Sequence, residues 1–81
     1  MAAEPPLPLT LDEHRELGTE VKRASARVRE LGRLVTAVYG PGSRVASDFA
    51  KAVDALERLQ ESMETQASRD LPGLHLDGIY R

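Results

Sequence analysis

Two long stretches of this sequence place apolar residues at spacings that alternate between four and three, and a short glycine- and proline-containing segment joins them. The first stretch consists of Leu17, Val21, Ala24, Val28, Leu31, Val35 and Val38. The second consists of Val45, Phe49, Ala52, Leu56, Leu59 and Met63. A repeat of this kind puts one apolar stripe along an α-helix and is typical of helices that pack lengthwise. We call the two sets the heptad seams, and they predict an all-α fold.

The first helix is expected to span about residues 10–39. Thr10 is followed three residues later by Glu13, which is a capping-box pattern in which each side chain accepts a hydrogen bond from the other residue's backbone amide. Gly40 suits the left-handed position after a helix, and Pro41 prevents the helix from continuing. The chain is therefore expected to turn over residues 40–43.

The second helix is expected to span about residues 43–69. Ser43 can cap its first turn, and Pro72 disfavours helical geometry at the residue before it. Because the connection is short, the two helices must be antiparallel neighbours. The sequence therefore predicts an antiparallel, coiled-coil-like two-helix hairpin.

The short turn also predicts which residues of the two helices face each other. Opposed residues should have numbers that sum to about 83 to 84, which places Val28 by Leu56. The same register places His14 by Asp70 at the open end of the hairpin.

A chain of 81 residues without cysteine has few ways to complete a core. Very small domains usually need disulfides, metals or partner subunits. A glycine inside a helix costs about 1 kcal/mol relative to alanine, so two of them on one stripe require a close neighbour. We therefore expect a homodimer that forms a four-helix bundle through the small and apolar residues that flank the seams: Gly18, Ser25, Gly32, Leu34, Ala46 and Val53. The alternative is a monomer whose C-terminal tail covers the open face.

The segments on either side of residues 10–70 are expected to be extended arms. Residues 1–9 form a proline-rich N-terminal arm, because proline has no backbone donor and favours polyproline II geometry. Residues 71–81 form a C-terminal tail that is too short to fold alone. Its large apolar residues are expected to dock on another surface: Leu74, Leu76, Ile79 and Tyr80.

The sequence offers no catalytic residues, no cofactor-binding motif and no metal-ligand motif. It has no cysteine, and no serine lies in a nucleophile-elbow context. Neither seam contains a carboxylate, and no Glu-x-x-His pattern of a di-iron bundle occurs. His14 beside Asp70 could form a metal or proton site, and the simpler interpretation is a half-exposed histidine next to an acid. An enzyme is not expected.

A basic stripe on the first helix is the second feature that could bind a partner. It consists of Arg15, Lys22, Arg29 and Arg33. Such a stripe can follow a phosphate backbone, but no aromatic residue is interleaved with it to stack on bases. The second helix carries Asp54, Glu57, Glu61 and Glu64, so pairing between the helices explains much of both charge clusters.

These observations predict a small non-enzymatic interaction or regulatory module that acts as a homodimer and binds an unidentified protein. The alternative is a nucleic-acid-binding regulator that uses the basic stripe. No apolar run approaches the roughly 20 residues of a membrane span. The first residues show no secretory-signal pattern, so the expected location is the cytoplasm, without membrane contact.

Overall fold

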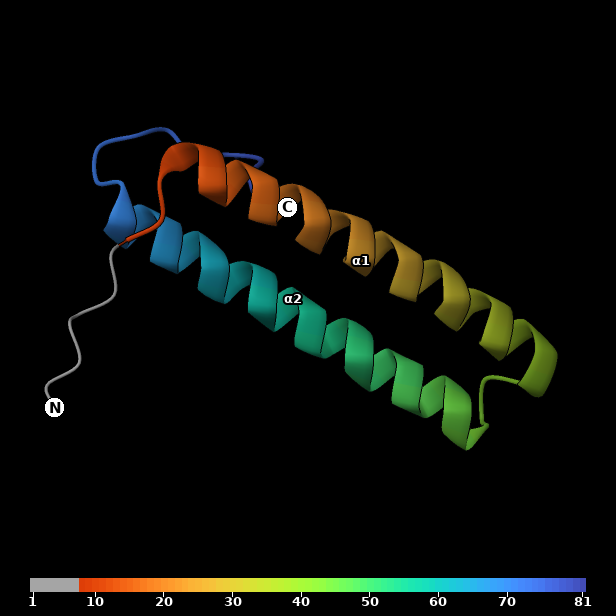
Figure 1. Ribbon diagram of the computed structural model, residues 1–81. Helices are drawn as coiled ribbons and strands as arrows, with labels where there is room; N and C mark the ends of the chain where they lie inside the picture. Colours follow the sequence, from red (N-terminus) through yellow and green to blue (C-terminus); the bar gives the residue numbers. More distant parts are fainter. Residues whose placement is uncertain (1–7) are drawn as a thin grey trace, which may run out of the picture.

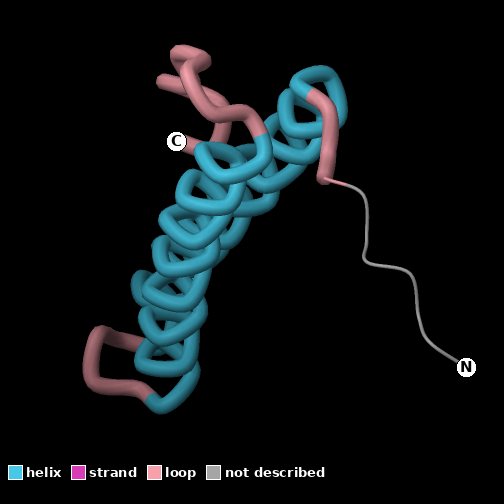
Figure 2. The backbone as a smooth tube through the Cα atoms, turned by 90° about the vertical axis from the view of Figure 1, so that its left-hand side faces the viewer, coloured by secondary structure: helices cyan, strands magenta, loops and turns pink. Residues whose placement is uncertain are grey.

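The chain folds as a hairpin of two long antiparallel helices that lie side by side (Figures 1 and 2). The computed structural model describes residues 8–81, so most of the predicted N-terminal arm, residues 1–7, lies outside the described residues. Helix α1 spans Leu11–Tyr39 and helix α2 spans Arg44–Asp70. The predicted all-α hairpin is confirmed, and neither helix has an apolar stretch long enough to cross a membrane.

The caps that begin the two helices are those that the sequence predicts. The Glu13 amide donates to the Thr10 hydroxyl at 3.2 Å, and the Thr10 amide donates to the Glu13 carboxylate at 3.0 Å. These bonds lower the pKa of Glu13, with the backbone bond of Thr10 as the largest cause. At the start of α2 the Ala46 amide donates to the Ser43 hydroxyl at 3.2 Å. Each cap satisfies backbone donors that have no partner inside the helix.

The turn between the helices depends on Gly40. Its φ of 96° and ψ of 153° belong to a region that is essentially restricted to glycine, so it differs from the left-handed helical geometry that a C-terminal glycine often adopts. The Gly40 amide still donates to the Thr36 carbonyl at 2.9 Å, and the Ser43 hydroxyl donates to the Gly40 carbonyl at 2.8 Å. The chain thereby reverses its direction within four residues.

The helices meet through half of each heptad seam together with the small residues that flank it. The seam residues that are partly buried in this way are Val21, Val28, Val35, Phe49, Leu56 and Met63. The most buried positions of α1 are His14, Gly18 and Ser25, and those of α2 are Ala46, Gln60 and Ala67. Gly18, Ser25 and Gly32 each follow a seam residue by one position, which is about 100° around the helix. A Cβ atom at Gly32 would lie 3.4 Å from the Phe49 Cβ, so the helices approach closely there. Small residues permit this approach, and the helices are rotated to bring them inward.

This rotation relocates the residues that were expected to form the dimer interface. Gly18, Ser25, Gly32, Ala46 and Val53 lie between the two helices of one chain or along the groove that separates them. Leu34, the sixth residue of that set, is 59% exposed. The close neighbour that the two helical glycines require is therefore supplied within the chain.

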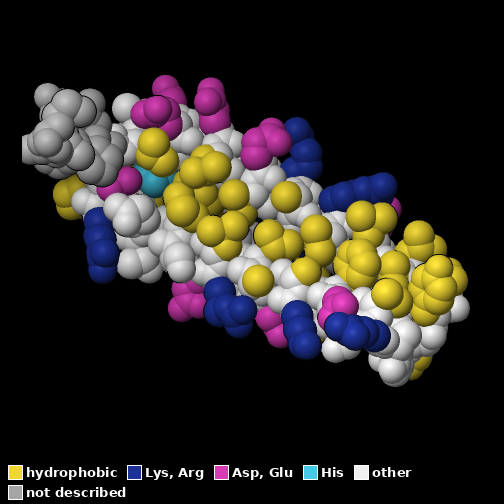
Figure 3. All heavy atoms as spheres, turned by 60° about the horizontal axis from the view of Figure 1, so that its bottom comes forward, with side chains coloured by type: hydrophobic (Ala, Val, Ile, Leu, Met, Phe, Trp, Pro, Cys, Tyr) yellow, Lys and Arg dark blue, Asp and Glu magenta, His cyan; other side chains and the backbone are white. Residues whose placement is uncertain are grey.

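The same rotation turns part of each heptad seam outward. Leu17, Val38, Val45 and Leu59 are between 39% and 64% exposed. Figure 3 shows apolar side chains running as a band over both helices, with charged side chains along the edges of the band. We call this surface the apolar face, and it consists of Leu17, Ala24, Leu31, Val38, Val45, Ala52 and Leu59. A single layer of two helices can bury only the sides that the helices turn toward each other.

The C-terminal tail, residues 71–81, returns from the end of α2 and crosses toward α1 (Figure 1). Gly73 and Gly78 have φ values of 83° and 78°, which side chains rarely adopt, and they bend the tail back. Ile79 then lies against Gly18, where an added Cβ atom would collide with the Ile79 carbonyl oxygen. The tail thus docks on its own hairpin.

The two helical glycines give a matched test of this packing. Gly18→Ala should lower the free energy of unfolding by at least about 1 kcal/mol, because the new methyl group overpacks against the tail backbone. Gly32→Ala should be neutral or stabilising by up to about 1 kcal/mol, because the space is sufficient and alanine favours the helix. Urea unfolding followed by circular dichroism measures both. A Gly18→Ala chain as stable as the wild type would contradict the described position of the tail.

Candidate functional site

Three segments from distant parts of the sequence meet at the open end of the hairpin. The His14 Nδ1 atom lies 2.6 Å from the Tyr80 hydroxyl, and the His14 Nε2 atom lies 2.8 Å from the Asp70 Oδ2 atom. His14 stands at the start of α1, Asp70 is the last residue of α2, and Tyr80 belongs to the tail. The contact between His14 and Asp70 confirms the register that the turn predicts.

The chemistry of the partners fixes the direction of these hydrogen bonds. The Asp70 carboxylate can only accept, so the His14 Nε2–H donates to it. In the neutral imidazole the Nδ1 atom then accepts from the Tyr80 hydroxyl. The second carboxylate oxygen, Oδ1, accepts from the Gln66 side-chain amide at 2.9 Å. The result is a chain of hydrogen bonds that runs from Tyr80 through His14 to Asp70.

This environment shifts the pKa values of the two acidic members in opposite directions. Hydrogen bonds from the Gln66 and His14 side chains lower the pKa of Asp70 and keep it ionised. Burial, and to a lesser extent the nearby Asp70 charge, raises the pKa of the Tyr80 hydroxyl. Tyr80 therefore stays protonated as a donor, and Asp70 stays charged as an acceptor.

His14 is more deeply placed than the sequence suggested. Its side chain is 0% exposed, and the expectation of a half-exposed histidine is wrong. The tail is the reason, because the Tyr80 ring packs edge-to-face on the imidazole at a centroid distance of 5.8 Å. Residues 8–81 contain no group of three or more histidine and acidic side chains placed to hold a metal ion. With both imidazole nitrogens bonded inside the protein, His14 acts here as a positioning group for Tyr80.

Polar side chains of both helices also hold the tail by its backbone. The buried Gln60 side-chain amide donates to the Tyr80 carbonyl at 2.7 Å, and the Lys22 ammonium donates to the Gly78 carbonyl at 2.6 Å. Arg81 pairs with Glu64 at 3.1 Å and with Glu61 at 3.8 Å. We call the surface that receives residues 78–81 the tail site.

The four predicted docking residues of the tail contribute unequally. Tyr80 is 1% exposed, and Ile79 and Leu76 are partly buried. Leu74 remains 52% exposed and makes little contact. The tail is thus fastened mainly at its last residues.

The structure divides the predicted basic stripe. Lys22 is bound to the tail, and Arg29 pairs with Glu57 of α2 at 3.1 Å. Within residues 8–81, Arg15 and Arg33 form no ion pair with an acidic side chain. The interpretation that charge pairing between the helices explains part of the basic cluster is supported at Arg29.

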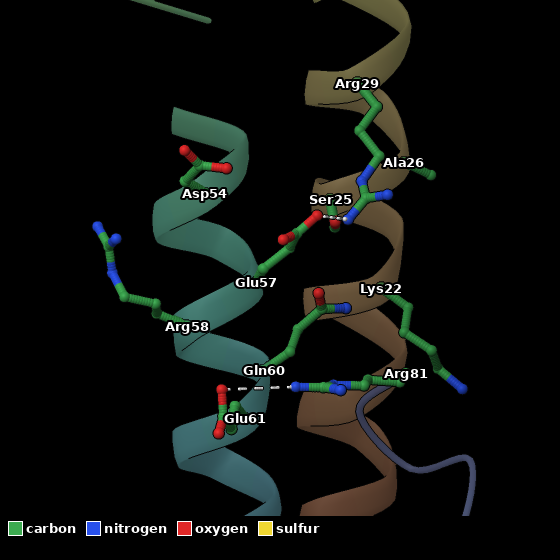
Figure 4. A pocket seen from close by; sticks show the side chains of 10 residues that line it. All are labelled: Lys22, Ser25, Ala26, Arg29, Asp54, Glu57, Arg58, Gln60, Glu61 and Arg81. Atoms are coloured by element: carbon green, nitrogen blue, oxygen red, sulfur yellow. Dashed lines mark hydrogen bonds and ion pairs between the residues drawn. The ribbon is translucent and has the colours of Figure 1, made fainter. Parts of the chain in front are cut away.

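The groove between the helices continues beyond the tail toward the turn. Its first part, drawn in Figure 4, has a volume of about 680 Å³ and mixed charge, with Lys22, Arg29 and Arg81 near Glu57 and Glu61. Its second part, of about 610 Å³, is mainly apolar and is lined by Gly32, Ala46, Phe49 and Val53 among others. We call these two parts together the open groove.

Gln60 is a member of the site that the sequence analysis did not identify. It shares a helix stripe with the buried Ala46 and Ala67, and a polar residue in such a position is the signal that it meets a buried polar partner. Tyr80 was predicted to dock, but the short apolar tail does not indicate its target.

No protein-family model, curated protein or solved structure has significant similarity to this chain. Any function must therefore be inferred from the surfaces described above.

Removal of the Tyr80 hydroxyl tests the energetic value of the hydrogen-bond chain. Tyr80→Phe should lower the free energy of unfolding by about 1–3 kcal/mol, because it leaves a buried imidazole nitrogen without a partner. Tyr39→Phe is the matched control, since Tyr39 is 68% exposed and its change should stay within about 0.5 kcal/mol. Equal effects in chemical denaturation would show that the phenol contact contributes nothing.

The lowered pKa of Asp70 predicts a stability that depends on pH at the acid end. Because the folded-state pKa lies below the ordinary value of 3.8, the stabilisation is complete above that value and is lost as the pH falls through the folded-state pKa. The difference in unfolding free energy between the wild type and Asp70→Asn should therefore shrink as the pH drops below about 4. Thermal unfolding across an acid pH series measures this, with Glu13→Gln as a control for the capping box. A difference in unfolding free energy between the wild type and Asp70→Asn that stays constant below about pH 4 would refute the lowered pKa of Asp70.

Proposed function

We propose that this chain is a non-enzymatic protein–protein interaction module that acts as a homodimer of hairpins. Two apolar faces would pack against each other and complete a four-helix bundle. The observation that carries the proposal is the apolar face itself, which runs over both helices and contains no charged residue (Figure 3).

The small number of buried apolar side chains supports an external partner for this face. Within residues 8–81, the hydrophobic residues that are fully buried are Ala46, Ala67 and Tyr80. Buried polar residues are as numerous, namely His14, Ser25 and Gln60. Completing the burial of one half-exposed leucine or valine contributes on the order of 1 kcal/mol, so covering Leu17, Val38, Val45 and Leu59 adds appreciably to a marginal core.

The pattern of the face favours a second copy over an unrelated partner. On both helices a large, a small and a large residue follow one another at intervals of seven residues. In α1 these are Leu17, Ala24 and Leu31, and in α2 they are Val45, Ala52 and Leu59. Because the helices are antiparallel, the face is suited to an isologous contact in which each copy presents the same surface. Large residues of one copy can then fill the space above small residues of the other.

The nucleic-acid hypothesis receives less support from the same contacts. Two of the four stripe residues, Lys22 and Arg29, are already bonded within the chain. The tail site and the open groove carry acidic residues such as Glu57 and Glu61 close to the basic side chains. These carboxylates would repel a phosphate backbone.

A charge placed on the apolar face should separate the dimer. In sedimentation equilibrium at tens of micromolar, the wild type should be dimeric and Leu59→Glu should be monomeric, because the interface would have to bury an unpaired carboxylate. Leu74→Glu makes the same change on the tail, where the side chain is 52% exposed, and it should remain dimeric. A wild-type chain that is monomeric at these concentrations, with its helical circular dichroism intact, would overturn the proposal.

A further inference from the structure

The tail site has the features of a recognition site for a short peptide. It binds two backbone carbonyls, one phenol and one guanidinium of residues 78–81. It also allows the backbone of Ile79 to lie directly against Gly18. We propose that the tail site binds an extended peptide segment in which an apolar residue is followed by tyrosine and a basic residue, and that the chain's own tail occupies it until a partner segment of this pattern replaces it.

The tyrosine would be the residue that determines specificity. Its hydroxyl lies 2.6 Å from the Nδ1 atom of a histidine that is 0% exposed. A site built around a hydroxyl discriminates strongly against phenylalanine, because the buried polar group is then left unpaired. A phosphotyrosine is also rejected, because Tyr80 is 1% exposed and a phosphate on its hydroxyl would bring a desolvated double negative charge into the contact with His14.

The neighbouring contacts define the rest of the pattern. Gly18 leaves room for the backbone of the apolar residue, and Gln60 and Lys22 bind main-chain carbonyls that every peptide carries. Glu61 and Glu64 select a basic residue after the tyrosine. The ligand class is therefore a peptide with the order apolar, tyrosine, basic.

The way the tail is attached makes it replaceable. Between Pro72 and Asp77 the tail is exposed except at Leu76, so its release has to break mainly the contacts of residues 78–81. A short flexible connection holds a ligand at an effective concentration in the millimolar range, so a weak intramolecular contact stays formed without a partner. The open groove begins where Arg81 ends, as Figure 4 shows.

This inference rests on the proposed function only in assuming a protein partner. The tail site lies along Gly18, Lys22 and Gln60, whereas the apolar face contains none of these residues. An experiment can therefore refute dimerisation without refuting peptide binding, and the reverse.

The test uses the full-length chain and a fluorescent peptide with the sequence of residues 71–81. Binding is measured by fluorescence anisotropy to the wild type and to Tyr80→Ala, whose own tail no longer fills the phenol position. The Tyr80→Ala chain should bind the peptide at least about tenfold more tightly than the wild type, because the competitor has been weakened. Circular dichroism verifies that the helices persist, and Tyr80→Phe replaces Tyr80→Ala should the latter unfold.

Two further peptides test the specificity of the site. A peptide with phenylalanine in place of its tyrosine, and one with phosphotyrosine, should each bind at least about tenfold more weakly than the parent peptide. Absence of binding to a folded Tyr80→Ala or Tyr80→Phe chain would overturn the proposal. So would equal affinities for the tyrosine and phenylalanine peptides. A wild-type chain that sediments as a monomer while its variants bind the peptide would refute the dimer alone.

Discussion

The burial of His14 between Asp70 and Tyr80 is the interaction on which the open end of this hairpin depends. The covalent turn holds the helices together at one end only, and at the other end three chain segments need a common contact. An imidazole supplies it because its two nitrogens can bond partners on opposite sides, one as donor and one as acceptor. The cost of burying these polar groups is offset only while all of the bonds are made, so the three segments are coupled.

The rotation of the helices gives the hairpin two unlike faces. Small residues at Gly18, Ser25 and Gly32 let the helices and the tail approach closely on one side. The same rotation leaves Leu17, Val38, Val45 and Leu59 of the heptad seams half-exposed on the other side. One face therefore carries the groove and the polar contacts of the tail, and the other is apolar and continuous. Dimerisation would use the apolar face, and peptide binding would use the tail site on the grooved face.

Such a division suits a small interaction module. A chain with so little buried apolar surface would gain stability by covering its apolar face, and under the proposed function a second copy would supply the matching surface. The polar side remains available for a different kind of contact, in which buried hydrogen bonds supply specificity. The Tyr80 phenol is held by directional bonds, whereas a partner on the apolar face would be held by area and shape.

The sequence by itself determined the helices, their caps, the turn and the register. These are local properties: the Thr10 and Glu13 pair, the Gly40–Pro41 break and the Ser43 cap each act within a few residues. The short turn then allows one register, so His14 could be placed by Asp70 in advance. Only the tertiary structure decided how each helix is rotated and where the tail docks. A repeat of four and three marks an apolar stripe, but which flank turns inward depends on the close contacts of Gly18 and Gly32 with distant residues. The target of Tyr80 is likewise a contact across 66 positions, and no local pattern in the sequence specifies it.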